Sequence, residues 1–60
     1  MNSKKLIKEL KRNGWYLYDT SGSHHQFKHQ LRQGKVTIPH PKKTLPKGTV
    51  NSILKQAGLK

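Results

Sequence analysis

The beginning of the chain carries hydrophobic residues at helical spacing. Leu6, Ile7 and Leu10 fall on one stripe, with Lys and Arg residues around it. This spacing predicts an amphipathic helix over residues 3–13, with Ser3 as its N-cap. The Asn-Gly pair that follows is a stop signal, because glycine readily adopts the left-handed conformation that often ends a helix.

The middle of the chain alternates between polar and hydrophobic positions, which is typical of β-strands. We expect three strands, over residues 15–19 (WYLYD), 23–29 (SHHQFKH) and 35–38 (KVTI), joined by turns at 20–22 and 30–34. Phe27 is the only strongly hydrophobic residue of the second strand, so its face is expected to point to the core. His25 and His29 share that face, whereas His24 points to the other one.

The neighbouring strands agree with a sheet that is covered on one face. Trp15 and Leu17 share one face of the first strand, and Tyr16 and Tyr18 share the other. The third strand carries its two hydrophobic residues, Val and Ile, on a single face. The sheet is therefore expected to have one hydrophobic face and one open face in contact with water.

A second helix follows an irregular segment. Three prolines exclude regular structure from residues 39–46 (PHPKKTLP). Beyond them, hydrophobic residues recur at i, i+3, i+4 and i+7 within residues 46–57 and predict a helix that Gly58 ends. The order helix, three strands, helix predicts an α+β fold (α-β-β-β-α), in which both helices cover one face of a three-stranded antiparallel sheet. We expect residues 1–60 to form one domain.

The composition of the chain then excludes several classes of function. The chain has no cysteine, which excludes disulfides, a thiolate nucleophile and a zinc knuckle. Its hydrophobic runs are too short for a signal peptide or a membrane span, so we expect a soluble, cytoplasmic protein. Thirteen Lys and Arg face two acidic residues, for a net charge of +11. Such a charge makes nucleic acid the first candidate ligand and an acidic protein the second; a lysine-rich protein with no polyanionic ligand is the remaining alternative.

Three of the four histidines lie in the stretch SGSHHQFKH at residues 21–29. A metal site there is disfavoured, because His24 and His25 point to opposite faces of a strand. His25 and His29 share a face but lie about 13 Å apart along it. Ser23 and His24 also point to opposite faces, so they cannot act as a Ser-His nucleophile pair. We therefore expect no metal and no cofactor.

Histidine and cations without a metal are well suited to RNA cleavage, because RNA supplies its own nucleophile, the 2′-hydroxyl. A histidine can act as general acid or base near neutral pH. The candidates for binding the phosphates are Lys28, Lys35, Lys42 and Lys43. Gly22 lets a phosphate approach the backbone just before the histidine strand. From these residues alone we expect a basic RNA-binding module, and RNA cleavage is the second possibility.

Four stretches, in this order and at this total length, carry a family resemblance: KKLIKELKRNGW, GSHHQFKH, VTIPHPKK and LPKGTVNSILKQAGL. They resemble the HicA toxins of bacterial HicA–HicB toxin–antitoxin systems, small ribonucleases that cleave mRNA. The resemblance implies a fold like that of double-stranded-RNA-binding domains and a catalytic histidine at His24, in the Gly-Ser-His element. His40, in the Pro-His-Pro turn, also matches a family position, as a substrate contact or as a loop anchor.

We therefore predict a metal-independent endoribonuclease toxin (an mRNA interferase) that a HicB-type antitoxin holds inactive. The 2′-hydroxyl would attack the adjacent phosphorus with His24 as general acid or base, leaving a 2′,3′-cyclic phosphate. The residues expected to contact RNA are Gly22, Lys28, Lys35, His40, Lys42 and Lys43. Two alternatives stay open: a basic module that binds RNA without cleaving it, and a protein whose charge only docks an acidic partner.

Overall fold

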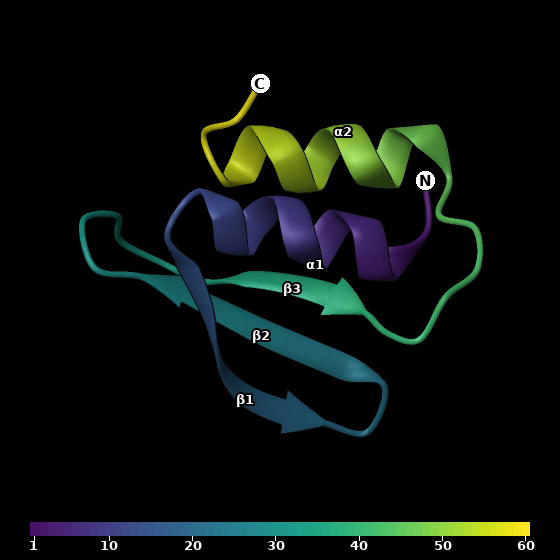
Figure 1. The fold of residues 1–60 in the computed structure, drawn as a ribbon, viewed down its shortest axis with the longest axis horizontal. Helices are drawn as coiled ribbons and strands as arrows, with labels where there is room; N and C mark the ends of the chain where they lie inside the picture. The colour runs from purple at the N-terminus through teal and green to yellow at the C-terminus, as the bar shows by residue number, and fades with distance from the viewer.

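Two helices lie on the same side of a three-stranded antiparallel sheet (Figure 1). The structure is a computed structural model and describes residues 1–60. The elements in chain order are α1 (Ser3–Arg12), β1 (Trp15–Ser21), β2 (His24–His29), β3 (Val36–Pro39) and α2 (Lys47–Gln56). The strands are arranged in the order β1-β2-β3. The predicted α-β-β-β-α fold is therefore confirmed.

The core fills the space between the helices and the sheet. Phe27, at the centre of β2, is 1% exposed, so its face does point to the core, as predicted. Burying a side chain of this kind contributes roughly 1.5–3 kcal/mol to folding. The ten buried hydrophobic residues of the core are Leu6, Leu10, Trp15, Phe27, Val36, Ile38, Leu45, Val50, Ile53 and Ala57.

Helix α1 begins with a cap that differs from the predicted one. The side chain of Asn2, not that of Ser3, accepts a hydrogen bond from the Lys5 backbone N–H at 2.8 Å. Ser3 is instead the first helical residue, and it is only 1% exposed. Its hydroxyl is turned away from the helix and contacts the segment between β3 and α2. The prediction of Ser3 as N-cap was therefore wrong by one residue.

Strand β1 is longer than predicted because it contains a β-bulge. Leu17 pairs with Phe27 and Asp19 with Gln26, so Tyr18 is the extra residue. Pairing then continues as far as Ser21, where the sequence had predicted a turn at residues 20–22. The turn that joins β1 to β2 has only two residues. Its first residue is a glycine at positive φ, as tight hairpins require.

The other element boundaries shift by one residue. Strand β3 begins at Val36 instead of Lys35 and includes Pro39, which had been assigned to the irregular segment. Helix α2 begins at Lys47, with Pro46 in the N-cap position. The inclusion of Pro39 and the start of α2 after Pro46 both follow from proline, which can end an edge strand or precede a helix although it donates no backbone hydrogen bond. Neither helix has the length and apolar character needed to span a bilayer.

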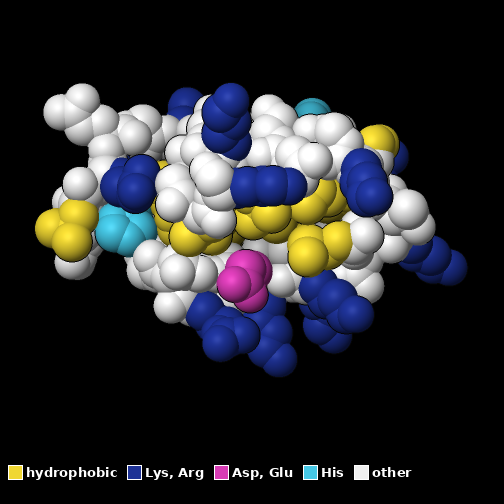
Figure 2. All heavy atoms as spheres, turned by 90° about the horizontal axis from the view of Figure 1, so that it is seen from above, with side chains coloured by type: hydrophobic (Ala, Val, Ile, Leu, Met, Phe, Trp, Pro, Cys, Tyr) yellow, Lys and Arg dark blue, Asp and Glu magenta, His cyan; other side chains and the backbone are white.

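The positive charge is spread over the molecule. Figure 2 looks down onto the helical layer, where Lys and Arg side chains surround a central band of hydrophobic ones. The only salt bridge joins Arg12 to Glu9 at 3.8 Å, one helical turn apart on α1. A single exposed pair of this kind contributes little to stability. The remaining cations are therefore not neutralised by carboxylates of the chain itself.

Candidate functional site

The sheet surface that faces away from the helices is called the open face below. It is formed by Tyr16, Tyr18, Asp19, Ser21, His24, Gln26, Lys28, Thr37 and Pro39. Its residues follow from the pairing, because residues directly opposite each other on neighbouring strands point to the same side. Phe27 points to the core, so the residues before and after it on β2 point to the open face.

His24 is the first residue of β2 and lies exposed at one end of the open face. It is paired with Ser21 on β1 and with Pro39 on β3, so strands hold its backbone on both sides. Neither partner carries a titratable side chain. The structure thus presents the imidazole to solvent from a fixed backbone position, on the face predicted from the strand alternation.

Gly22 lies two residues before His24, in the tight turn. It has φ +57°, and no atom lies within 4 Å of the position that a β-carbon would occupy. The space beside the turn is therefore open to a ligand. A side chain at this position would be strained because of the positive φ.

Two of the predicted phosphate-binding lysines lie at the other end of the open face. Lys28 is paired with Tyr16 on β1. Lys35 directly precedes Val36, the partner of Phe27, so its backbone lies near that of Lys28 just outside β3. Lys28 is four positions along β2 from His24, a distance of about 13 Å. The open face therefore carries a histidine at one end and two neighbouring cations at the other.

His40 is not on the open face. It is half-buried, and its Nδ1 lies 2.7 Å from the Ser3 hydroxyl at the start of α1. Its ring packs edge-on against His25, with centroids 4.8 Å apart, and its backbone N–H donates to the Ser23 carbonyl at 2.7 Å. These contacts are those of a loop anchor. A contact between His40 and RNA stays a prediction.

Lys42 and Lys43 form a second basic group next to the start of α1. The Lys42 N–H donates to the Ser3 hydroxyl at 2.8 Å, and the Ser3 N–H donates to the Lys42 carbonyl at 2.9 Å. Both lysine side chains are exposed, and with Lys4 they line a shallow depression. The structure thus divides the predicted RNA contacts. Gly22, Lys28 and Lys35 accompany His24, whereas His40, Lys42 and Lys43 gather at the helix start.

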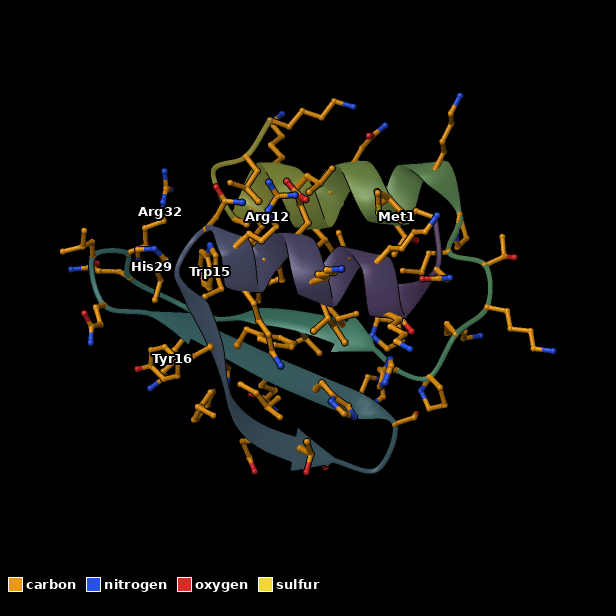
Figure 3. The ribbon with its side chains drawn as sticks, viewed as in Figure 1. Met1, Arg12, Trp15, Tyr16, His29 and Arg32 are labelled. Carbon is orange, nitrogen blue, oxygen red and sulfur yellow. The ribbon has the colours of Figure 1, made fainter.

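The remaining histidines have structural contacts. His25 is half-buried beside His40 and is paired with Ile38 on the core side of the sheet. The Nδ1 of His29 accepts the Leu31 N–H at 3.0 Å, so its Nε2 carries the proton and donates to the Asn13 carbonyl at 2.9 Å. The His29 ring also packs edge-on against Trp15 at 5.2 Å (Figure 3). Nowhere do three His, Asp or Glu side chains come together as a set of metal ligands.

The sequence interpretation missed two features of this region. One is Ser3, whose buried hydroxyl joins α1 to the segment that carries His40. The other is the pair Tyr16 and Tyr18, which lie beside Lys28 on the open face. Alternation in WYLYD already placed both tyrosines on one face. No local signal indicated that this face was the one that carries His24.

The structure thus defines a small basic α+β domain, with an exposed histidine and lysines on the open face of its sheet. Known proteins have a similar fold. The family model of the HicA toxin of bacterial toxin–antitoxin systems matches residues 3–59. A solved toxin–antitoxin complex from Streptococcus pneumoniae is similar, with 37% identity over 98% of each chain and a TM-score of 0.84. A HicA3 and HicB3 toxin–antitoxin complex has 34% identity over 100% of this chain and 97% of the other, with a TM-score of 0.81. No curated protein sequence matches. The chain belongs to the HicA toxin family.

Proposed function

We propose that this protein is a metal-independent endoribonuclease, a toxin that cleaves mRNA and that a HicB-type antitoxin holds inactive. The observation that carries the proposal is the exposure of His24 on the open face, beside the open space at Gly22. The net charge of +11 supports an RNA substrate, and membership of the HicA toxin family supports the role as a toxin.

The proposed reaction is an intramolecular transfer within RNA. The 2′-hydroxyl oxygen attacks the adjacent phosphorus, and the bond from phosphorus to the 5′ oxygen of the next nucleotide breaks. One end becomes a 2′,3′-cyclic phosphate and the other a 5′-hydroxyl. His24 either accepts the proton of the 2′-hydroxyl or donates a proton to the leaving 5′ oxygen. Both steps need a side chain that a substrate can reach, and the exposure of His24 supports this role.

The cations hold the substrate and offset its charge. Lys28 and Lys35 lie side by side at the far end of the open face, where they bind phosphates of a strand that passes His24. The glycine turn lets the reacting phosphate approach the backbone. The second basic group, with Lys42 and Lys43, binds a flanking part of the same RNA.

A HicB-type antitoxin is the proposed protein partner. Both similar solved structures are toxin–antitoxin complexes. A partner that inactivates the toxin would cover the open face and block access to His24. Because this chain carries only two acidic residues against thirteen basic ones, the covering surface of the antitoxin is expected to be acidic.

A non-catalytic RNA-binding module is the second candidate. It is favoured by the surroundings of His24, whose cross-strand neighbours Ser21 and Pro39 offer no second acid or base. Incubating the purified protein with single-stranded RNA in EDTA distinguishes the two. We expect cleavage in EDTA, with 2′,3′-cyclic phosphate and 5′-hydroxyl ends. Intact RNA with a shifted electrophoretic band would contradict the nuclease and support the binding module.

A further inference from the structure

Two exposed aromatic rings lie on the open face, outside the hydrophobic core. Tyr16 and Tyr18 are 46% and 41% exposed, whereas Trp15, which points to the helices, is 3% exposed. Figure 3 shows Tyr16 on the opposite side of the sheet from Trp15. Tyrosine is common on strands because its ring packs against neighbouring side chains. Here both helices are on the other face, so no layer of the protein covers these rings.

Tyr16 lies in the same row of the sheet as Lys28, and Tyr18 lies next to that row, at the bulge of β1. The Lys28 ammonium is 4.5 Å from the centroid of the Tyr18 ring, and Tyr16 is the cross-strand partner of Lys28. The Tyr18 hydroxyl donates to the Gln26 side-chain oxygen at 3.3 Å, which orients the ring. Lys35 follows on the other side of Lys28. The result is a platform of two rings beside two cations.

We propose that Tyr16 and Tyr18 stack unpaired bases of single-stranded RNA while Lys28 and Lys35 bind its phosphates. An aromatic ring stacks any base, because every base has a π-face. An arriving base takes the place of the Lys28 ammonium over the Tyr18 ring, and the ammonium then binds a phosphate of the same strand. The proposal rests on the proposed function, since it names the class of RNA that reaches His24.

The geometry favours a single strand over a duplex. The row that holds Tyr16 and Lys28 is four residues of β2 from His24, about 13 Å, so a strand can run along β2 from the rings to the imidazole. In a duplex the base faces are stacked on one another and cannot meet an aromatic side chain. The adjacent lysines and the charge of +11 favour RNA over a protein as the occupant.

The experiment measures RNA affinity in a His24→Ala background, so that its outcome does not depend on cleavage. Tyr16→Val and Tyr18→Val remove the rings but keep a residue that favours strands. Each is expected to weaken binding of a single-stranded oligonucleotide by roughly 5- to 150-fold and to leave duplex affinity unchanged. Tyr16→Phe keeps the ring and should bind as the parent does. Tyr18→Phe keeps the ring but loses the hydrogen bond to Gln26, so it should lose less affinity than Tyr18→Val. Leu17→Val is the matched control on the same strand, because Leu17 is exposed to a similar extent (42%) but is paired with Phe27 and so does not belong to the open face.

Two further measurements keep the proposal falsifiable if a Val variant fails to fold. Abasic nucleotides in the oligonucleotide should weaken its binding to the His24→Ala protein by a similar factor. The dependence of affinity on salt should stay unchanged in the Val variants, since stacking releases no counterions. Unaltered single-strand affinity in the Val variants, or an equal loss for duplex RNA, would overturn the proposal. So would a loss confined to antitoxin binding, which would make this face a protein-docking surface.

Discussion

At the scale of single residues, two adjacent histidines have different surroundings because successive side chains of a strand point to opposite faces of the sheet. His24 points to the open face and is exposed. His25 points to the core side, where it is half-buried, is paired with Ile38 and packs against the His40 ring. The same side chain is thus available to a ligand at one position and is part of the packing at the next.

Replacing His24 with Ala tests the proposed acid or base. No core cavity forms, so the free energy of unfolding should change by well under about 1 kcal/mol. Cleavage of RNA should fall by roughly a hundred- to ten-thousandfold. Growth inhibition on expression should disappear, whereas affinity for the antitoxin should change little, because that interface is larger than one side chain. Cleavage rate and melting temperature are the measurements.

His25→Ala is the matched variant one residue away. It removes the contact with the His40 ring, so it should lower the melting temperature while the folded protein still cleaves RNA. Two outcomes would contradict the assignment. One is a His24→Ala protein that cleaves like the parent. The other is a His25→Ala protein that stays folded but is inactive while His24→Ala unfolds.

At the scale of elements, hydrophobic spacing was sufficient to predict both helices and all three strands, because each pattern is local in the sequence. The element ends were less predictable. Whether Asn2 or Ser3 caps α1 depends on the Ser3 hydroxyl, which is engaged by Lys42 and His40 far along the chain. The length of β1 depends on the bulge at Tyr18, which exists only in the pairing with β2. Such long-range contacts leave no local signal.

Ser3 is the residue on which the junction between α1 and the segment after β3 depends. Its hydroxyl accepts from the Lys42 N–H at 2.8 Å, lies 2.7 Å from His40 Nδ1 and is part of a residue only 1% exposed. Ser3→Ala leaves those partners without a hydrogen bond in a partly buried place. Each unsatisfied group costs about 1–3 kcal/mol, so the variant should unfold at clearly lower denaturant concentration.

The control for this variant is Ser52→Ala, which changes an exposed serine within α2. Its free energy of unfolding should stay within about 0.5 kcal/mol of the parent value. Denaturant titrations of both variants compare the two sites directly. Equal stability of Ser3→Ala and Ser52→Ala would show that the Ser3 contacts do not hold the junction together.

At the scale of the whole molecule, the sequence predicted a polyanionic ligand but not how the cations are arranged. Net charge is a sum, and it carries no information about position. The fold places Lys35 near Lys28, because the residues beside them, Val36 and Phe27, are paired. It places Lys42 and Lys43 elsewhere, beside the start of α1. The two groups of lysines lie apart because of the path that the backbone takes through the strands and helices, which the net charge does not reveal.

This arrangement predicts how RNA binding responds to salt. Each phosphate neutralised on a single strand should add roughly −0.7 to the slope of log affinity against log salt. Lys28→Ala or Lys35→Ala should make the slope shallower by a fraction of a unit and leave the fold intact, because both side chains are exposed. Lys8→Ala, an exposed lysine of α1 in the helical layer, is the control and should change the slope less. Titrations of the His24→Ala protein between low and physiological ionic strength measure these slopes.

A flat dependence of RNA affinity on salt would rule out phosphate binding by the open face. A slope equally reduced by all three substitutions would show that the charge acts as a diffuse field, with no site among the strands.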